Sequence, residues 1–92
     1  MKLPIPNTFE LGGVKHTTKH DETISDHGLD GCFLPAQAII KILPGLQEDV
    51  EAETQVHEWV EAINDRYELK LKHAQIQTVA AGFWQILKSL KA

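Results

Sequence analysis

The chain has 92 residues, 42% of them hydrophobic and 24% charged, which fits one small globular domain with a modest core. Its formal net charge is -4 and its nine Lys and Arg residues are scattered, which argues against a nucleic-acid-binding surface, where basic residues would concentrate. No apolar stretch is long enough to span a membrane, so neither nucleic acid nor a membrane is an expected partner.

Residues 1–45 have the composition of short strands and turns, because they hold all four prolines and five of the six glycines. We expect four extended segments: 8–11, 14–19, 32–34 and 38–43. A turn at Gly12-Gly13 separates the first two, and a polar loop over 20–30 follows the second. The last segment is mostly apolar, which indicates a well-buried strand.

Residues 46–92 follow a different period, with apolar residues three or four positions apart. This spacing predicts one helix from about 47 to about 68 and another from about 73 to 90. The connector between them is short, so the helices should pack against each other and against the sheet. We therefore predict an α+β fold in a single domain, 1–92. A small antiparallel sheet of three or four strands forms the strand region, and two packed helices follow it.

The first predicted helix carries His57-Glu58-Trp59-Val60-Glu61, an HExxE sequence. Residues four apart lie on one face of a helix, one turn apart, so His57 and Glu61 can bind the same metal ion. The sequence resembles the HExxH motif of zinc peptidases, with a carboxylate in place of the second imidazole. Glu58 lies beside the pair, where a carboxylate that does not bind the metal can act as a general base.

A catalytic zinc site usually has three protein ligands, so one more ligand is required. His73 is the best candidate, because the short connector brings the start of the second helix back towards the first. Glu68 is the weaker alternative, since it lies too far along the same helix from Glu61 to share an ion. Two imidazoles and one carboxylate are a common ligand set of catalytic zinc, so we expect zinc at His57, Glu61 and His73.

Two other interpretations of these metal-capable residues remain open. In the simplest one, His57, Glu58 and Glu61 belong to the solvated face of an amphipathic helix, which needs no functional explanation. In the other, a metal is bound in the first half of the chain, where a second group of candidates lies. This group consists of His16, His20, Asp21, Asp26 and His27. Polar loops often collect such residues without binding an ion.

The single Cys32 cannot form an internal disulfide, which is typical of a reducing compartment. The first seven residues contain two prolines where a signal peptide needs an unbroken apolar run. We therefore expect a cytoplasmic protein, and we interpret Cys32 as a small buried side chain rather than a nucleophile. Trp59 and Trp84 lie on or beside the apolar stripes of their helices and are expected in the core.

The second half of the chain resembles a known family over two segments, from His57 to His73 and from Gln75 to Leu87. They are similar to the minimal zinc-dependent metallopeptidase-like proteins encoded by bacteriophages and prophages, which are distant relatives of the larger zincins. In that family a metal helix of HExxH or HExxE type precedes a short loop and a closing helix that ends in a Gly-Leu-Tyr-Gln-Val-Leu-like sequence. Gly82-Phe-Trp-Gln-Ile-Leu87 matches that ending, and Phe9-Glu-Leu-Gly-Gly13 resembles the opening strand and turn of the family.

The resemblance implies a minimal zincin-like fold in which His57, Glu61 and His73 bind zinc and Glu58 is the catalytic base. It implies a phage- or prophage-type metallopeptidase that hydrolyses peptide bonds, with a peptide or protein substrate, in the cytoplasm of a bacterial host. It also implies that the strand before the metal helix, 38–43, pairs with the substrate backbone. The alternative function is a non-catalytic interaction protein of phage or prophage origin, which uses the same scaffold with or without a metal.

Overall fold

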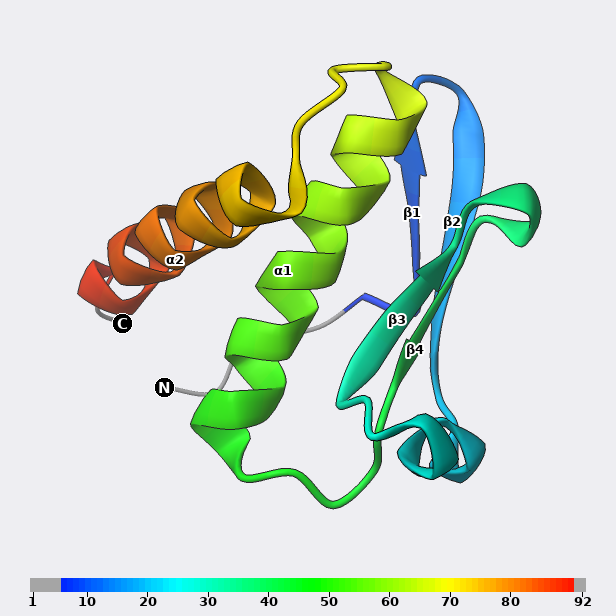
Figure 1. The fold of residues 1–92 in the computed structure, drawn as a ribbon, viewed down its shortest axis with the longest axis vertical. Coiled ribbons are helices and arrows are strands. Elements are labelled where there is room, and N and C mark those ends of the chain that lie inside the picture. Colours follow the sequence, from blue (N-terminus) through cyan, green and yellow to red (C-terminus); the bar gives the residue numbers. More distant parts are fainter. Residues whose placement is uncertain (1–5, 91–92) are drawn as a thin grey trace.

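The computed structural model describes residues 6–90, which form a four-stranded sheet and two α-helices (Figure 1). The strands are β1 (Thr8–Leu11), β2 (Val14–His20), β3 (Gly31–Leu34) and β4 (Ile39–Ile42), and the helices are α1 (Glu48–Arg66) and α2 (His73–Ser89). Two short 3-10 helices, η1 (Glu22–His27) and η2 (Pro35–Gln37), lie between strands, the first of them in the predicted polar loop. The α+β fold is confirmed, and each predicted strand and helix begins and ends within two residues of its expected position.

The sheet has the strand order β1-β2-β4-β3 and is mixed rather than purely antiparallel. β1 pairs with β2 and β3 pairs with β4 in antiparallel fashion, whereas β2 and β4 are parallel. The predicted antiparallel sheet is wrong in this one pairing. The chain leaves β2 through η1, forms β3 at the sheet edge and then returns between β2 and β3, so β4 runs in the same direction as β2.

The position of β4 also excludes a substrate-binding role for the segment 38–43. β4 is paired on both sides, with β2 and with β3, so its backbone has no free edge. The expectation that this strand pairs with a substrate is therefore wrong. The strand at the free edge beside α1 is β3, which contacts that helix directly.

α1 lies between the sheet and α2, so it is buried on two sides (Figure 1). On the side of α1 that faces the sheet, Ala62 forms a cluster with Ile40 and Ile42. On the side that faces α2, a second cluster of buried residues comes from both helices. The residues of this second cluster are Ala52, Val56, Val60, Ile76, Ala80 and Trp84. Trp59 packs against both clusters, so the prediction that Trp59 and Trp84 belong to the core is confirmed.

The last turns of α1 project beyond its crossing with α2. Ile63 and Tyr67, which continue the apolar stripe in the sequence, are 37% and 53% exposed as a result.

None of the helices in residues 6–90 combines the length and apolar character that crossing a membrane requires.

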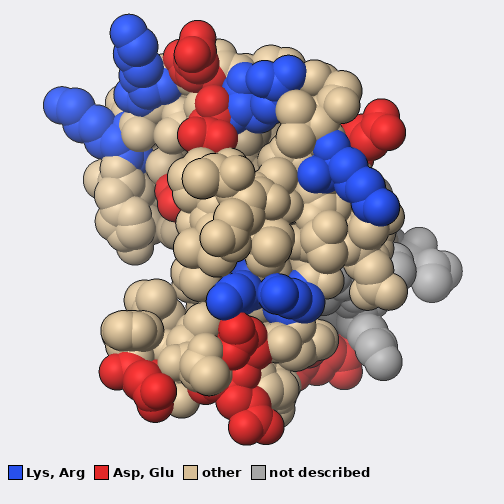
Figure 2. Space-filling model, turned by 90° about the vertical axis from the view of Figure 1, so that its right-hand side faces the viewer, with Lys and Arg blue, Asp and Glu red and all other residues tan. Residues whose placement is uncertain are grey.

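The face of the sheet turned away from α1 is polar and carries charges of both signs. Along β2, buried His16 and Thr18 alternate with exposed Lys15 and Lys19, as expected for a sheet that is covered on one face. Figure 2 shows basic and acidic side chains interspersed on the side of the molecule opposite α2. Both helices lie on the other face, and the metal-capable residues of the second half of the chain lie there with them.

Candidate metal centre

His57, Glu61 and His73 converge on one point beside α1. Each offers one ligand atom, and these three atoms lie within 4.8 Å of one another. The imidazole rings of His57 and His73 are 5.8 Å apart between centroids and meet at 65°. His57 and Glu61 are half-buried, whereas His73 is exposed at the first turn of α2. The structure therefore brings together the three residues that the sequence singled out.

The local sequence explains why His73 returns to α1. After the helix, Glu68 and Lys70 adopt left-handed backbone conformations, with φ of 52° and 59°, which turn the chain sharply. The side chain of Asn64 on α1 then accepts a hydrogen bond of 2.8 Å from the backbone N–H of Leu71, which ties the connector to α1. At the start of α2, Gln75 Oε1 accepts a 2.8 Å hydrogen bond from the backbone N–H of Lys72 and fixes the first turn.

The donor set suits zinc. Ligands about 2.0–2.2 Å from a tetrahedral ion lie roughly 3–4 Å from each other. The present separations of the three atoms are at most 4.8 Å, which is close to that spacing. His73 is exposed at a helix terminus, so its ring has room to rotate. Two imidazoles and one carboxylate leave a fourth position of a tetrahedral ion open, as catalytic zinc sites do.

The simplest interpretation of the sequence placed Glu58 on the solvated face of α1, but in the structure it is buried. Its side chain is only 6% exposed, because α1 is covered on the sheet side as well as on the α2 side. Burial, and secondly the nearby Glu61 carboxylate, raise the pKa of Glu58 to about 7. A carboxyl group with a pKa near neutrality can both accept and return a proton, which is what general acid–base catalysis requires.

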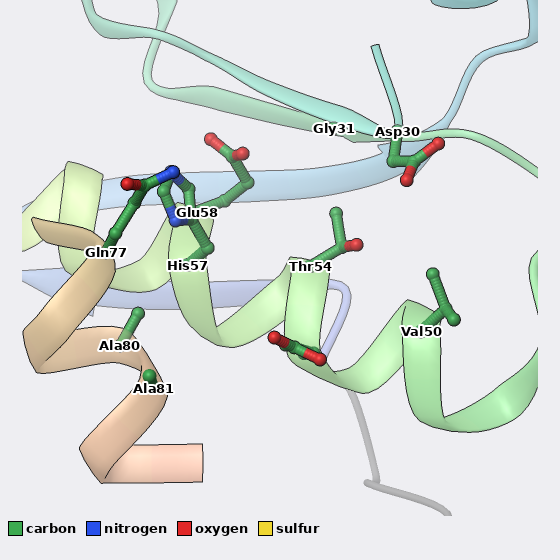
Figure 3. A pocket seen from close by; sticks show the side chains of 10 residues that line it. Asp30, Gly31, Val50, Thr54, His57, Glu58, Gln77, Ala80 and Ala81 are labelled. Carbon is green, nitrogen blue, oxygen red and sulfur yellow. The ribbon is translucent and has the colours of Figure 1, made fainter. Parts of the chain in front are cut away.

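A cleft of about 570 Å³ opens in front of His57 and Glu58 (Figure 3). It is bounded by the first three turns of α1, by the start of β3 and by α2. The residues that line it are Asp30, Gly31, Val50, Glu53, Thr54, His57, Glu58, Gln77, Ala80 and Ala81. Apart from the two in the HExxE sequence, none of these was predicted from the sequence, because they come from three segments that only the fold brings together.

Gly31 allows β3 to approach α1 closely at the cleft. A Cβ atom on residue 31 would lie 2.6 Å from Thr54 Cγ2, and 3.3 Å from both Glu58 Oε2 and Ile42 Cδ1. The first distance is shorter than any ordinary carbon–carbon contact, so with a larger residue either the Thr54 side chain or β3 would have to shift. The sequence gives one hint of this role, a glycine immediately before an apolar strand segment.

We expect Gly31→Ala to lower the free energy of unfolding by about 1–3 kcal/mol, the usual cost of overpacking a tight contact. Thr54→Ser removes the methyl group that would clash, so Gly31→Ala/Thr54→Ser should recover most of the loss. Urea denaturation of the single and double variants measures both effects. Gly82→Ala is the control, since a Cβ at Gly82 meets nothing within 4 Å and replaces glycine inside a helix. Equal stability of Gly31→Ala and wild type, or no recovery in the double variant, would contradict this packing argument.

The histidines and aspartates of the first half of the chain do not assemble into a metal site. Among residues 6–90, no second group of three metal-capable side chains converges. His16 is buried between Phe9 and Phe33, with ring centroids 5.3 and 6.0 Å away, and its Nδ1 lies 3.0 Å from the carbonyl oxygen of Val14. His20 pairs with Glu51 at 2.8 Å instead of with a metal partner.

The remaining candidates also have structural explanations. Asp21 accepts hydrogen bonds from Thr23 and forms a 2.9 Å ion pair with Lys41, and these contacts hold the pKa of its carboxyl well below the usual range. Burial, and then the Glu58 carboxylate, raise the pKa of Cys32, which disfavours a nucleophilic thiolate. Glu68 is exposed in the connector and is not part of the ligand cluster.

No family model matches this sequence, and no curated protein or solved structure is significantly similar to it.

Proposed function

We propose that this protein is a zinc-dependent metallopeptidase, of the minimal phage- and prophage-encoded type that its second half resembles. The observation that carries the proposal is the convergence of His57, Glu61 and His73 next to a cleft that also contains the buried carboxyl of Glu58. A zinc ion held by these three ligands would supply a Lewis acid that polarises a peptide carbonyl and acidifies a water molecule.

In this proposal Glu58 moves the proton. Its carboxylate accepts a proton from the attacking water and later donates it to the departing amine of the cleaved peptide. Within residues 6–90 its side chain has no hydrogen-bond or ion-pair partner that would hold the proton elsewhere. In the metal-free protein, burial and then the Glu61 carboxylate raise the pKa of Glu58 to about 7, so this carboxyl exchanges its proton readily near neutral pH.

The free edge of β3 gives an extended substrate a place to bind. The backbone N–H of Leu43 donates a 2.8 Å hydrogen bond to the carbonyl of Asp30, and β3 and β4 continue from there in antiparallel register. Because hydrogen-bonded and non-hydrogen-bonded pairs alternate in such a ladder, the backbone groups of Gly31 and Phe33 point away from β4. Gly31 lies next to Glu58, so a peptide that added a strand at this edge would run near that carboxyl.

A second candidate function, a non-catalytic interaction protein on the same scaffold, is favoured by the exposed apolar side chains of α2. Val79, Phe83 and Ile86 are 47%, 49% and 63% exposed, although they repeat at helical spacing. With Val56, Trp59 and Ile63 of α1, the first two line an apolar groove of about 230 Å³. In this alternative a metal, if bound, would hold α2 against α1 and no bond would be cleaved.

Metal analysis combined with a hydrolysis assay tests the proposal. Untagged protein purified without chelator should contain about one zinc ion per chain and should release fluorescent fragments from a labelled casein or peptide mixture. A zinc chelator should abolish the release, and added zinc should restore it. A chain that takes up no zinc at micromolar concentration would exclude the site, and zinc uptake without hydrolysis would favour the interaction protein.

A further inference from the structure

The cleft in front of the metal-capable residues has acidic walls. Asp30, immediately before β3, lines one side of it and Glu53 on α1 lines another, while no Lys or Arg is among the residues that border the cleft. In Figure 3, Asp30 lies on the segment that leads into β3, across from Thr54 on α1. The cleft thus offers the Asp30 and Glu53 carboxylates to a ligand, with no basic Lys or Arg side chain in its lining to neutralise them.

These carboxylates have no structural role within residues 6–90. Neither the Asp30 nor the Glu53 side chain forms an ion pair or a hydrogen bond there, unlike Asp21, which pairs with Lys41. A second observation independently marks the cleft as a binding site. Glu58, a residue that is 94% buried and whose side chain likewise has no partner within residues 6–90, lines the same cleft.

The dimensions match a long cationic side chain. Glu53 precedes His57 by four residues on α1, which corresponds to about 6 Å along the helix axis. A lysine or arginine side chain spans roughly that distance, so its charged end can reach Glu53 while its backbone lies beside the metal-capable residues. Gly31, Ala80 and Ala81 are small, and they leave the cleft open to the aliphatic part of such a side chain.

We propose that the cleft selects peptides with a Lys or Arg residue next to the bond held at the His57–Glu61–His73 cluster, and that Asp30 and Glu53 bind the cationic group. This inference rests on the proposed peptidase function, because it assumes that a peptide occupies the cleft. The proposed group is a side chain, and the free-amine peptide in the test below distinguishes it from the amino terminus of a substrate.

The test is a binding measurement on the zinc-loaded Glu58→Gln variant, so that the result does not depend on turnover. Three acetylated peptides that differ at one position, Lys, norleucine or Glu, are compared by fluorescence polarisation with a norleucine peptide that has a free amino terminus. We expect the Lys peptide to bind about tenfold more tightly than the norleucine peptide, as two partly exposed ion pairs allow, and the Glu peptide to bind most weakly. The preference should decrease at high salt.

Charge-neutral variants assign the preference to the cleft. Adding Asp30→Asn and Glu53→Gln should reduce the affinity of the Lys peptide to that of the norleucine peptide. Glu10→Gln, at an exposed position on β1 at the opposite edge of the sheet, should leave every affinity unchanged. Equal binding of the Lys and norleucine peptides would overturn the inference, as would a Lys preference that survives the double substitution. Tighter binding of only the free-amine peptide would overturn the assignment to a side chain.

The peptidase function and the preference for Lys or Arg can be disproved independently of each other. If wild-type protein hydrolyses peptides without preferring Lys or Arg, the substrate inference is wrong and the peptidase function stands. If wild-type protein hydrolyses nothing but the Lys preference depends on Asp30 and Glu53, the cleft binds basic peptides and the catalytic function is wrong.

Discussion

The Glu58→Gln variant is expected to bind zinc as the wild type does and to hydrolyse peptides about 100- to 10,000-fold more slowly. Glutamine has nearly the same shape as glutamate but cannot accept and return a proton, and general acid–base catalysis contributes a factor of this size. Initial rates with one peptide, together with zinc content measured on the same samples, give both quantities. Loss of activity with full zinc content would separate a catalytic Glu58 from a residue that only supports the site.

The same variant should not be destabilised in the metal-free state. Because the folded protein raises the pKa of Glu58 from 4.5 to about 7, it favours the protonated carboxyl. The stability that depends on this proton is fully present below pH 4.5 and is lost as the pH rises from 4.5 to 7. Glutamine stays neutral throughout, so above pH 7 the variant should be more stable than the wild type by up to about 3 kcal/mol.

Urea denaturation of both chelated proteins at pH 4.5 and pH 8 measures this difference. The two should have similar stability at pH 4.5 and diverge at pH 8. A Glu58→Gln variant that is less stable than wild type at pH 8 would mean that the carboxylate has a stabilising partner. Hydrolysis that persists at the wild-type rate in this variant would remove Glu58 from the mechanism.

Local sequence was sufficient to predict the helices and the metal-capable cluster. The positions of α1 and α2 follow from apolar residues at intervals of three and four, and the helix itself places His57 and Glu61 one turn apart. The third member, His73, followed from chain length alone, because a connector of six residues cannot carry the start of α2 far from the end of α1. These features depend on residues close together in the sequence.

The strand order and the burial of Glu58 depend on contacts between distant residues and could not be predicted in the same way. The short strand segments do not indicate the order of the strands in the sheet, so the parallel pairing of β2 with β4 was not predicted. Periodicity assigned Glu58 to the solvated face because it assumes one buried side per helix. In the structure α1 is covered on two sides, by α2 and by the sheet. On the sheet side, Gly31 of β3 lies close to Thr54 and Glu58 of α1.

That two carboxylates line one cleft could not be predicted from the sequence either. Asp30 and Glu53 are 23 residues apart and have no motif in common, so nothing in the sequence connects them. They face one cleft only because β3 lies at the sheet edge next to α1. The substrate preference inferred from them therefore depends on the fold, whereas the metal-capable cluster follows largely from the sequence.

Replacing a ligand should have the second large effect, a loss of zinc affinity. His57→Ala and His73→Ala are each expected to weaken zinc binding by at least about 100-fold, because even the residues that only orient metal ligands cost about 10- to 100-fold when they are removed. Competition with a chromogenic zinc chelator measures the affinities. His27→Ala is the matched control, since His27 is exposed on η1 and lies outside the ligand cluster.

Substitution of Glu61 distinguishes a ligand from a nearby charge. Glu61→Ala should lose zinc as the histidine variants do, whereas Glu61→His should retain it, because two imidazoles one turn apart on a helix form the HExxH arrangement of zinc peptidases. If Glu61 acted only through its charge, the histidine variant would behave like the alanine variant. Retention of zinc in His73→Ala would show that the third ligand lies elsewhere, and zinc bound equally by all four variants would place the metal outside the His57–Glu61–His73 cluster.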